Sequence, residues 1–229
     1  SRSGYIDLAA FHTGNGAWPE ALAVLARGIE RVPARQSPLL YLERGKVSYA
    51  VGDYLAAIDD FNIAVYHLPR QAEGWLLRGL SRAGLKEYRP AIRDCEKAVS
   101  LAPDDHRAHY ALGRVLFRAG RYRAAADALQ RAVDLEPQQK ASLSLLGRAL
   151  VQLEEFDRAR SCLQSAVDLG ADDAATCDAW RLALRGFPWD AEAPGSPAAE
   201  AGLFLEVLEA VEEEPLFPGF NQDLPTFYE

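Results

Sequence analysis

The sequence predicts an all-α protein built as a solenoid of about five helical hairpins, followed by a capping helix and an extended acidic tail. Two observations predict this fold class. Residue types recur every 34 positions along most of the chain, and each period carries the signals of two short helices. After residue 185 lysine and arginine cease, while proline and glutamate become frequent, which marks a change of structure.

The 34-residue period is visible in five columns that stay in phase with one another. Chance does not produce five such columns in a chain of 229 residues. Their members are Gly45, Gly79, Gly113 and Gly147; Tyr54, Tyr88, Tyr122 and Phe156; Ala57, Ala91, Ala125 and Ala159; Ala64, Ala98, Ala132 and Ala166; and Pro69, Pro103 and Pro137.

Each column has a physical interpretation within a pair of helices. The glycine leaves room on the first helix where a neighbour approaches closely, and the aromatic residue opens the second helix and packs between the two. The alanines allow helices of adjacent units to touch, and the proline ends the second helix because it cannot continue one. A single hairpin cannot bury its apolar faces, so neighbouring hairpins must stack.

These columns resemble the tetratricopeptide repeat family, and the resemblance covers roughly residues 3–186. In the second unit Ala57, Phe61, Ala64 and Pro69 reproduce the family pattern, and Trp75 and Gly79 do so at the front of the third. The resemblance implies a right-handed solenoid. The expected units span about 3–35, 38–71, 72–105, 106–139 and 140–171, with a capping helix over 172–186.

The first and last parts of the array depart from the regular pattern. In the first unit the step from Pro33 to Pro69 is 36 residues, and the two extra residues fit in a loop over 34–37. The first helix of that unit, around 3–14, matches the family weakly. The fifth unit lacks the closing proline, where Gly170 and Ala171 stand instead.

The end of the chain is predicted to lie outside the repeats and to carry a strong negative charge. All 25 lysines and arginines lie before residue 187, whereas ten of the 33 acidic residues follow it. The formal charge is therefore +2 before that point and −10 after it. We expect a linker over 187–197, an acidic amphipathic helix over 198–213 and an extended tail over 214–229.

No motif indicates an enzyme, and none indicates a cofactor. His106 and His109 could share a helix face, but two histidines without a third ligand make a weak case for a metal, so no metal site is expected. Cys95, and by the same interpretation Cys162, are expected to be buried structural thiols. The sparse cysteines and the lack of a signal-peptide pattern indicate a cytoplasmic protein.

Nucleic acid and membranes are both poor candidates as partners. A repeat region of charge +2 lacks the electrostatic footprint of a nucleic-acid-binding protein. No apolar run approaches the roughly 20 residues that span a bilayer. We therefore expect protein partners, with a helical repeat that binds RNA as a remote alternative.

The family resemblance implies that the first helices line a concave groove that binds an extended peptide or a helix. The helical period then selects the residues that point into it. The candidate groove residues are Leu42, Lys46, Tyr49, Leu76, Arg107, Tyr110, Arg114, Phe117, Arg118 and Arg148. A competing interpretation puts the apolar members, Leu42 and Leu76, in the core, and leaves the arginines on a solvated face.

The tail is expected to dock in such a groove, either in the same chain or on a partner. It combines negative charge with large apolar side chains and prolines that favour an extended segment. The candidate docking residues are Leu216, Phe217, Phe220, Leu224, Phe227 and Tyr228. The simpler alternative is that the helix over 198–213 only covers the exposed apolar face of the last helix of the array.

The leading functional interpretation is a non-enzymatic scaffold or adaptor. One alternative is a co-chaperone or assembly factor. Some members of the resembled family hold a terminal carboxylate with a clamp of lysine, asparagine and arginine, but the matching positions here include Glu43 and Glu73, which would repel it. Another alternative is a structural subunit of a large complex, such as a ciliary or transport assembly.

Overall fold

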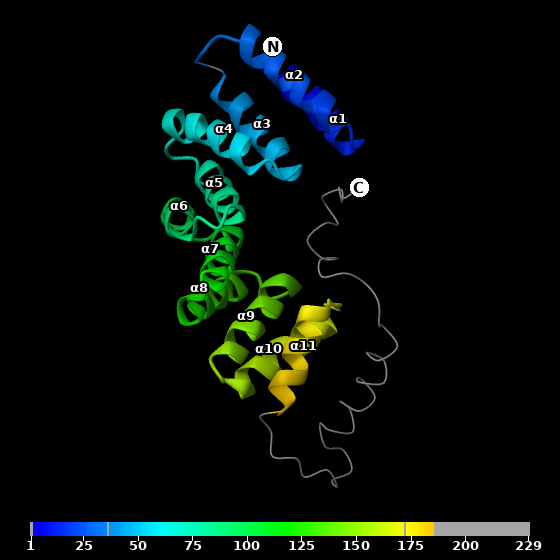
Figure 1. Cartoon of the computed structure of the whole chain (residues 1–229), viewed down its shortest axis with the longest axis vertical. Helices are drawn as coiled ribbons and strands as arrows, with labels where there is room; N and C mark the ends of the chain where they lie inside the picture. The colour runs from blue at the N-terminus through cyan, green and yellow to red at the C-terminus, as the bar shows by residue number, and fades with distance from the viewer. Residues whose placement is uncertain (1, 36, 172, 186–229) are drawn as a thin grey trace. The chain divides into compact units, whose positions relative to one another are not determined.

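The computed structural model describes residues 2–35, 37–171 and 173–185, and these residues form α-helices and no strand. The all-α class predicted from the sequence is confirmed (Figure 1). None of the described helices is long and apolar enough to cross a membrane. The predicted linker over 187–197, the acidic helix over 198–213 and the tail over 214–229 lie outside the described residues.

The described helices form two compact units. Unit 1 contains the four hairpins α1/α2, α3/α4, α5/α6 and α7/α8, and unit 2 contains the hairpin α9/α10 with the helix α11. The bounds are α1 Arg2–Gly14, α2 Trp18–Arg31, α3 Pro38–Ala50, α4 Tyr54–His67, α5 Ala72–Gly84, α6 Tyr88–Leu101, α7 His106–Arg118, α8 Tyr122–Leu135, α9 Lys140–Gln152, α10 Phe156–Asp168 and α11 Ala174–Arg185.

The second helix of each regular hairpin begins at its column aromatic, which for α4 is Tyr54. The Asp53 carboxylate caps α4 by accepting a hydrogen bond from the backbone N–H of Ala56, 3.1 Å away. Two residues before each aromatic the backbone is left-handed. Glycine supplies this conformation at Gly52 and Gly120, whereas Lys86 (φ 63°) and Glu154 (φ 60°) adopt it despite their side chains. The left-handed conformation therefore recurs every 34 residues, even though the residue type at these positions varies.

The glycine column exists because a side chain of the partner helix occupies the space where a Cβ would be. A Cβ built on Gly45 would lie 2.7 Å from Cε1 of Phe61, and one on Gly113 would lie 2.5 Å from Cγ of Leu129. On Gly79 a Cβ would meet the sulfur of Cys95 at 2.7 Å. The second to fifth hairpins are thus each closed by one buried residue of the second helix pressed onto a glycine of the first.

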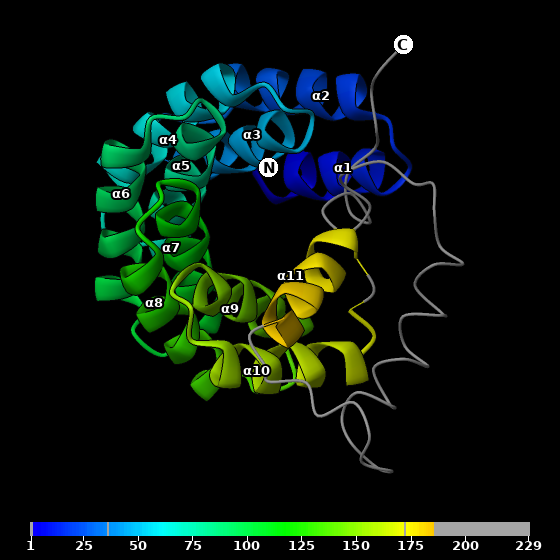
Figure 2. The ribbon, with the colours of Figure 1, turned by 60° about the horizontal axis from the view of Figure 1, so that its bottom comes forward.

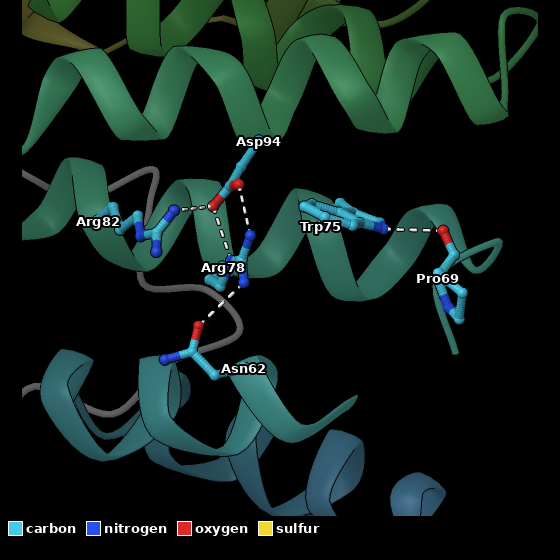
Figure 3. Close-up of polar contacts among 6 residues, drawn as sticks. All are labelled: Asn62, Pro69, Trp75, Arg78, Arg82 and Asp94. Carbon is cyan, nitrogen blue, oxygen red and sulfur yellow. Dashed lines mark hydrogen bonds and ion pairs between the residues drawn. The ribbon is translucent and has the colours of Figure 1, made fainter. Parts of the chain in front are cut away.

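A side chain on the first helix also ties down the turn that precedes it. The indole Nε1 of Trp75 donates to the carbonyl of Pro69 at 3.0 Å (Figure 3). One repeat later, Nε2 of His109 lies 2.8 Å from the carbonyl of Pro103. His109 is buried and has this structural contact, and the described residues hold no group of three potential metal ligands.

Buried ion pairs connect the two helices of the second and third hairpins. Arg44 on α3 meets Asp60 on α4, and the equivalent Arg78 on α5 meets Asp94 on α6. Arg78 also donates to Asn62 on α4 at 2.9 Å, so it links two hairpins (Figure 3). These contacts cross-link the helices of unit 1 that form the second and third hairpins.

The cysteine expectation holds for Cys95 and is wrong for Cys162. Cys95 is fully buried against Gly79, and burial together with the charge of Asp94 raises the pKa of its thiol to about 12. Cys162 is only partly buried, because Leu163 stands 34 residues after Leu129 and fills the core position instead.

We predict that Cys95 in the folded protein reacts with iodoacetamide at pH 8 more than about a hundredfold slower than in urea, because the thiolate is the nucleophile. Because the pKa of the thiol is raised on folding, the protonated thiol of Cys95 contributes to the free energy of unfolding below pH 9.0. This contribution is lost as the pH rises towards 12. Peptide mass spectrometry of the labelled chain measures the rates. Labelling of native Cys95 as fast as that of Cys162 would contradict the prediction.

Candidate functional site

Four helices of unit 1 form one continuous surface, which we call the first-helix face. It consists of α1, α3, α5 and α7, each of which contacts the next, while α2, α4, α6 and α8 lie behind them (Figure 2). The candidate groove residues of unit 1 all lie on α3, α5 and α7. Their burial and their partners decide which of them a ligand could touch.

The apolar candidates separate into core and surface. Leu42 is 1% exposed and packs with Phe61, Ala57 and Ala64 in the core of its hairpin. It is therefore removed from the groove, and the competing core interpretation applies to it. Leu76 on α5 is partly exposed and stays a groove candidate.

Lys46 on α3 is held between two carboxylates. Its Nζ lies 2.9 Å from Oε1 of Glu43 and 2.9 Å from Oε1 of Glu73 on α5. Burial alone would lower the pKa of Lys46, but the hydrogen bonds to these two carboxylates outweigh burial and raise it above its ordinary value. Three charges thus meet at the junction of α3 and α5, with a net charge of −1.

Arg114 on α7 reaches across to α3. One of its guanidinium nitrogens donates to the hydroxyl of Tyr49 at 3.3 Å, although 65 residues separate the two. The same guanidinium lies over the ring of Tyr110, 5.9 Å from its centroid. Tyr49, Tyr110 and Arg114 are all partly exposed, so the structure brings three of the predicted residues together in one cation-aromatic cluster.

The remaining α7 candidates extend this cluster along the helix. Arg107 and Arg118 are exposed, and Phe117 is partly exposed with its ring edge-on to Tyr122 at 5.4 Å. Arg107 forms an ion pair with Asp105, and the hydrogen bonds from Arg107 hold the pKa of Asp105 below its ordinary value. Helix α7 therefore carries both arginines and aromatic rings. Its three arginines give it a positive charge, since the helix contains no acidic residue.

Two groups of candidates lie outside the described part of unit 1. Arg148 lies on α9 in unit 2, where it is partly exposed. The six tail residues predicted to dock, from Leu216 to Tyr228, lie outside the described residues.

A pocket between α1 and α3 was missed by sequence reasoning. It has a volume of about 360 Å³ and is lined by Ile6, Ala9, Ala10, Thr13, Gly14, Trp18, Leu25, Glu43, Lys46 and Val47. Only Lys46 of this set was a predicted groove residue. The sequence feature that could have indicated this pocket is the group of small residues Ala9, Ala10 and Gly14 on α1. This helix is also where the match to the repeat pattern is weakest.

Comparison with known proteins identifies relatives of the repeat region. A family model described as tetratricopeptide repeat matches residues 39–106, and one described as anaphase-promoting complex, cyclosome, subunit 3 matches residues 85–166. The small glutamine-rich tetratricopeptide repeat-containing protein 2 of Saccharomyces cerevisiae is 32% identical over 77 residues. That match covers 34% of this chain and 22% of the yeast protein.

Solved structures share the fold at low sequence identity. MamA 41-end from Desulfovibrio magneticus RS-1 is 24% identical with a TM-score of 0.66, over 75% of this chain and 97% of that one. YrrB, described as a TPR protein with an unusual peptide-binding site, is 21% identical with a TM-score of 0.62, over 77% and 90%. The APC/C hetero-tetramer Cut9-Hcn1 is 16% identical with a TM-score of 0.70, over 80% and 36%. These likenesses show the helical-repeat solenoid fold.

Proposed function

Because the chain belongs to the tetratricopeptide repeat family, we propose that it is a non-enzymatic scaffold or adaptor that binds a segment of a partner protein on the first-helix face. The segment is an extended peptide or a helix. The observation that carries this proposal is the cation-aromatic cluster of Tyr49, Tyr110 and Arg114, together with the exposed Arg107 and Arg118 on the same helix. Arginine and tyrosine are among the residues enriched at the energetic centres of protein interfaces.

The chemistry of α7 favours an acidic ligand with aromatic side chains. Arginine grips carboxylates with two parallel hydrogen bonds and stacks on aromatic rings. The chain carries such a segment itself, since residues 187–229 have a formal charge of −10 and hold several large apolar side chains. We propose that the tail over 214–229 docks on α7, either of its own chain or of a partner copy.

The proposal is tested with a fluorescent peptide of residues 214–229 added to a chain that lacks them. Reversing the charge of both Arg107 and Arg118 to glutamate is expected to weaken binding about tenfold or more, because rim charges act through complementarity. The binding should also weaken as salt is raised. Fluorescence anisotropy measures the affinity.

The matched control is Arg131→Glu on α8. It reverses the charge of an exposed side chain that does not lie on the first-helix face. It is expected to leave the affinity unchanged. The proposal for the tail fails if its deletion changes neither thermal stability, oligomeric state nor partner capture.

A second candidate function is a fixed subunit of a large complex. The match of residues 85–166 to a subunit of the anaphase-promoting complex favours it. A free adaptor should be monodisperse alone in size-exclusion chromatography, whereas a fixed subunit should behave poorly without its neighbours. That experiment separates the two candidates without reference to any peptide.

A further inference from the structure

The pocket between α1 and α3 is open because its walls are built from small residues. Ala9 and Ala10 contribute only methyl groups, and a Cβ built on Gly14 would meet nothing within 4 Å. The floor belongs to one buried core cluster, in which Leu25 of α2 is 0% exposed and Val47 of α3 is 6% exposed. A volume of about 360 Å³ is at the lower end of ligand pockets, which span roughly 300–1,000 Å³. It suits one large apolar side chain.

A buried donor in the wall has no partner. The indole Nε1 of Trp18 is buried without a hydrogen-bond acceptor among the described residues. Leaving such a donor unpaired costs free energy, and most tryptophans avoid it. Trp18 lines the pocket, but its Nε1 atom has essentially no exposed surface there, so this donor is not itself a contact for an occupant.

The charges beside the pocket favour a basic neighbour. Glu43 and Lys46 line it, and Glu73 shares Lys46 with Glu43, so two carboxylates face one ammonium. The side chain of Glu73 is 46% exposed and can meet a ligand. The chain's own tail does not fit here, because no lysine or arginine follows residue 185 and the tail is strongly acidic.

We infer that this pocket is an anchor site for a partner peptide that carries one large apolar side chain next to a lysine or arginine. The apolar side chain enters between α1 and α3, and its basic neighbour pairs with Glu43 and Glu73. The inference deepens the proposed function and rests on it, but it assigns this ligand to a different part of the first-helix face. An acidic ligand goes to α7, and a basic-apolar one goes to the α1–α3 pocket.

The test uses a random peptide library displayed on phage, selected in parallel on the full chain and on the variant Ala10→Phe. Ala10 is an exposed pocket residue, so a phenylalanine there fills the pocket without entering the core. Peptides enriched on the full chain are expected to carry a large apolar residue beside lysine or arginine, and to bind Ala10→Phe about tenfold more weakly or worse.

The matched control is Ala124→Phe, which adds the same ring at an exposed alanine of α8. It should leave the affinity of the enriched peptides unchanged. Glu43→Gln combined with Glu73→Gln should remove the preference for basic residues while keeping the preference for an apolar one. Peptide binding should also change the indole emission of the chain, and the change should be absent in Trp18→Phe.

The inference is overturned if no enriched peptide binds Ala10→Phe more weakly than the full chain, or if the peptides that lose affinity for Ala10→Phe are acidic. Acidic peptides that bind both chains equally belong to α7. In each case the proposed function is judged separately by the tail peptide and its α7 variants. Binding of that peptide to α7 with no pocket-dependent ligand would discard the anchor pocket and leave the scaffold function in place.

Discussion

Replacing Asp94 with alanine is expected to lower the free energy of unfolding by about 3–5 kcal/mol, because it removes one side of a buried ion pair. The Asp94 side chain is 4% exposed and accepts from Arg78 through both oxygens, at 2.7 and 2.9 Å. Arg82 donates to it as well, at 2.7 Å. The variant leaves the guanidinium groups of Arg78 and Arg82 largely buried without the carboxylate that they pair with. Urea unfolding followed by circular dichroism measures the loss.

Two other aspartates provide an internal scale for this prediction. Asp60 is similarly buried but pairs with Arg44, whereas Asp94 pairs with both Arg78 and Arg82, so Asp60→Ala should cost less than Asp94→Ala. Asp134 on α8 is 47% exposed and pairs with Arg131 at 3.7 Å, so Asp134→Ala should cost about 0–1 kcal/mol. Equal costs for Asp94→Ala and Asp134→Ala would contradict the buried-pair argument.

The fourth hairpin offers a test of what the ion pair contributes. There Leu112, Leu116 and Ala128 stand 34 residues after Arg78, Arg82 and Asp94, so all three charges are replaced together. Replacing a buried ion pair by apolar residues is often neutral or stabilising. We therefore expect the triple variant Arg78→Leu, Arg82→Leu, Asp94→Ala to be more stable than Asp94→Ala alone.

The repeat architecture could be predicted from the sequence because it depends on close packing within one period. A glycine is needed wherever a side chain such as Phe61 presses on the partner helix, and an aromatic residue begins each regular second helix. These requirements recur from the second hairpin to the fifth and leave columns in the sequence. The left-handed turn recurs too, but it leaves no glycine column in the sequence, because Lys86 and Glu154 adopt this conformation in place of glycine.

The candidate site was harder to predict because it depends on how successive hairpins are set against each other. The helical period puts Leu42 and Lys46 on one stripe, yet neighbouring helices bury Leu42 and leave Lys46 half-exposed. The contact between Tyr49 and Arg114 spans 65 residues and depends on the relation of α3 to α7, which no single repeat encodes. The α1–α3 pocket forms where residues are small, and small residues leave a weak pattern.

Replacing Phe61 with alanine should have an effect as large as the loss of Asp94. Phe61 is fully buried, and its ring occupies the space that a Cβ of Gly45 would need. Alanine would leave a cavity that the glycine cannot fill, and Phe→Ala changes in cores cost about 3–5 kcal/mol. Thermal and urea unfolding of the full chain measure the loss.

The chain itself supplies the matched control for this change. Leu129 and Leu163 occupy the same column above Gly113 and Gly147, so a leucine is compatible with the hairpin geometry. Phe61→Leu should therefore cost less than about 1.5 kcal/mol. A similar cost for leucine and alanine would show that the ring itself, rather than filled volume, is required. Because Tyr49 packs on the same cluster, Phe61→Ala should also loosen its contact with Arg114, and the tail peptide should then bind α7 more weakly.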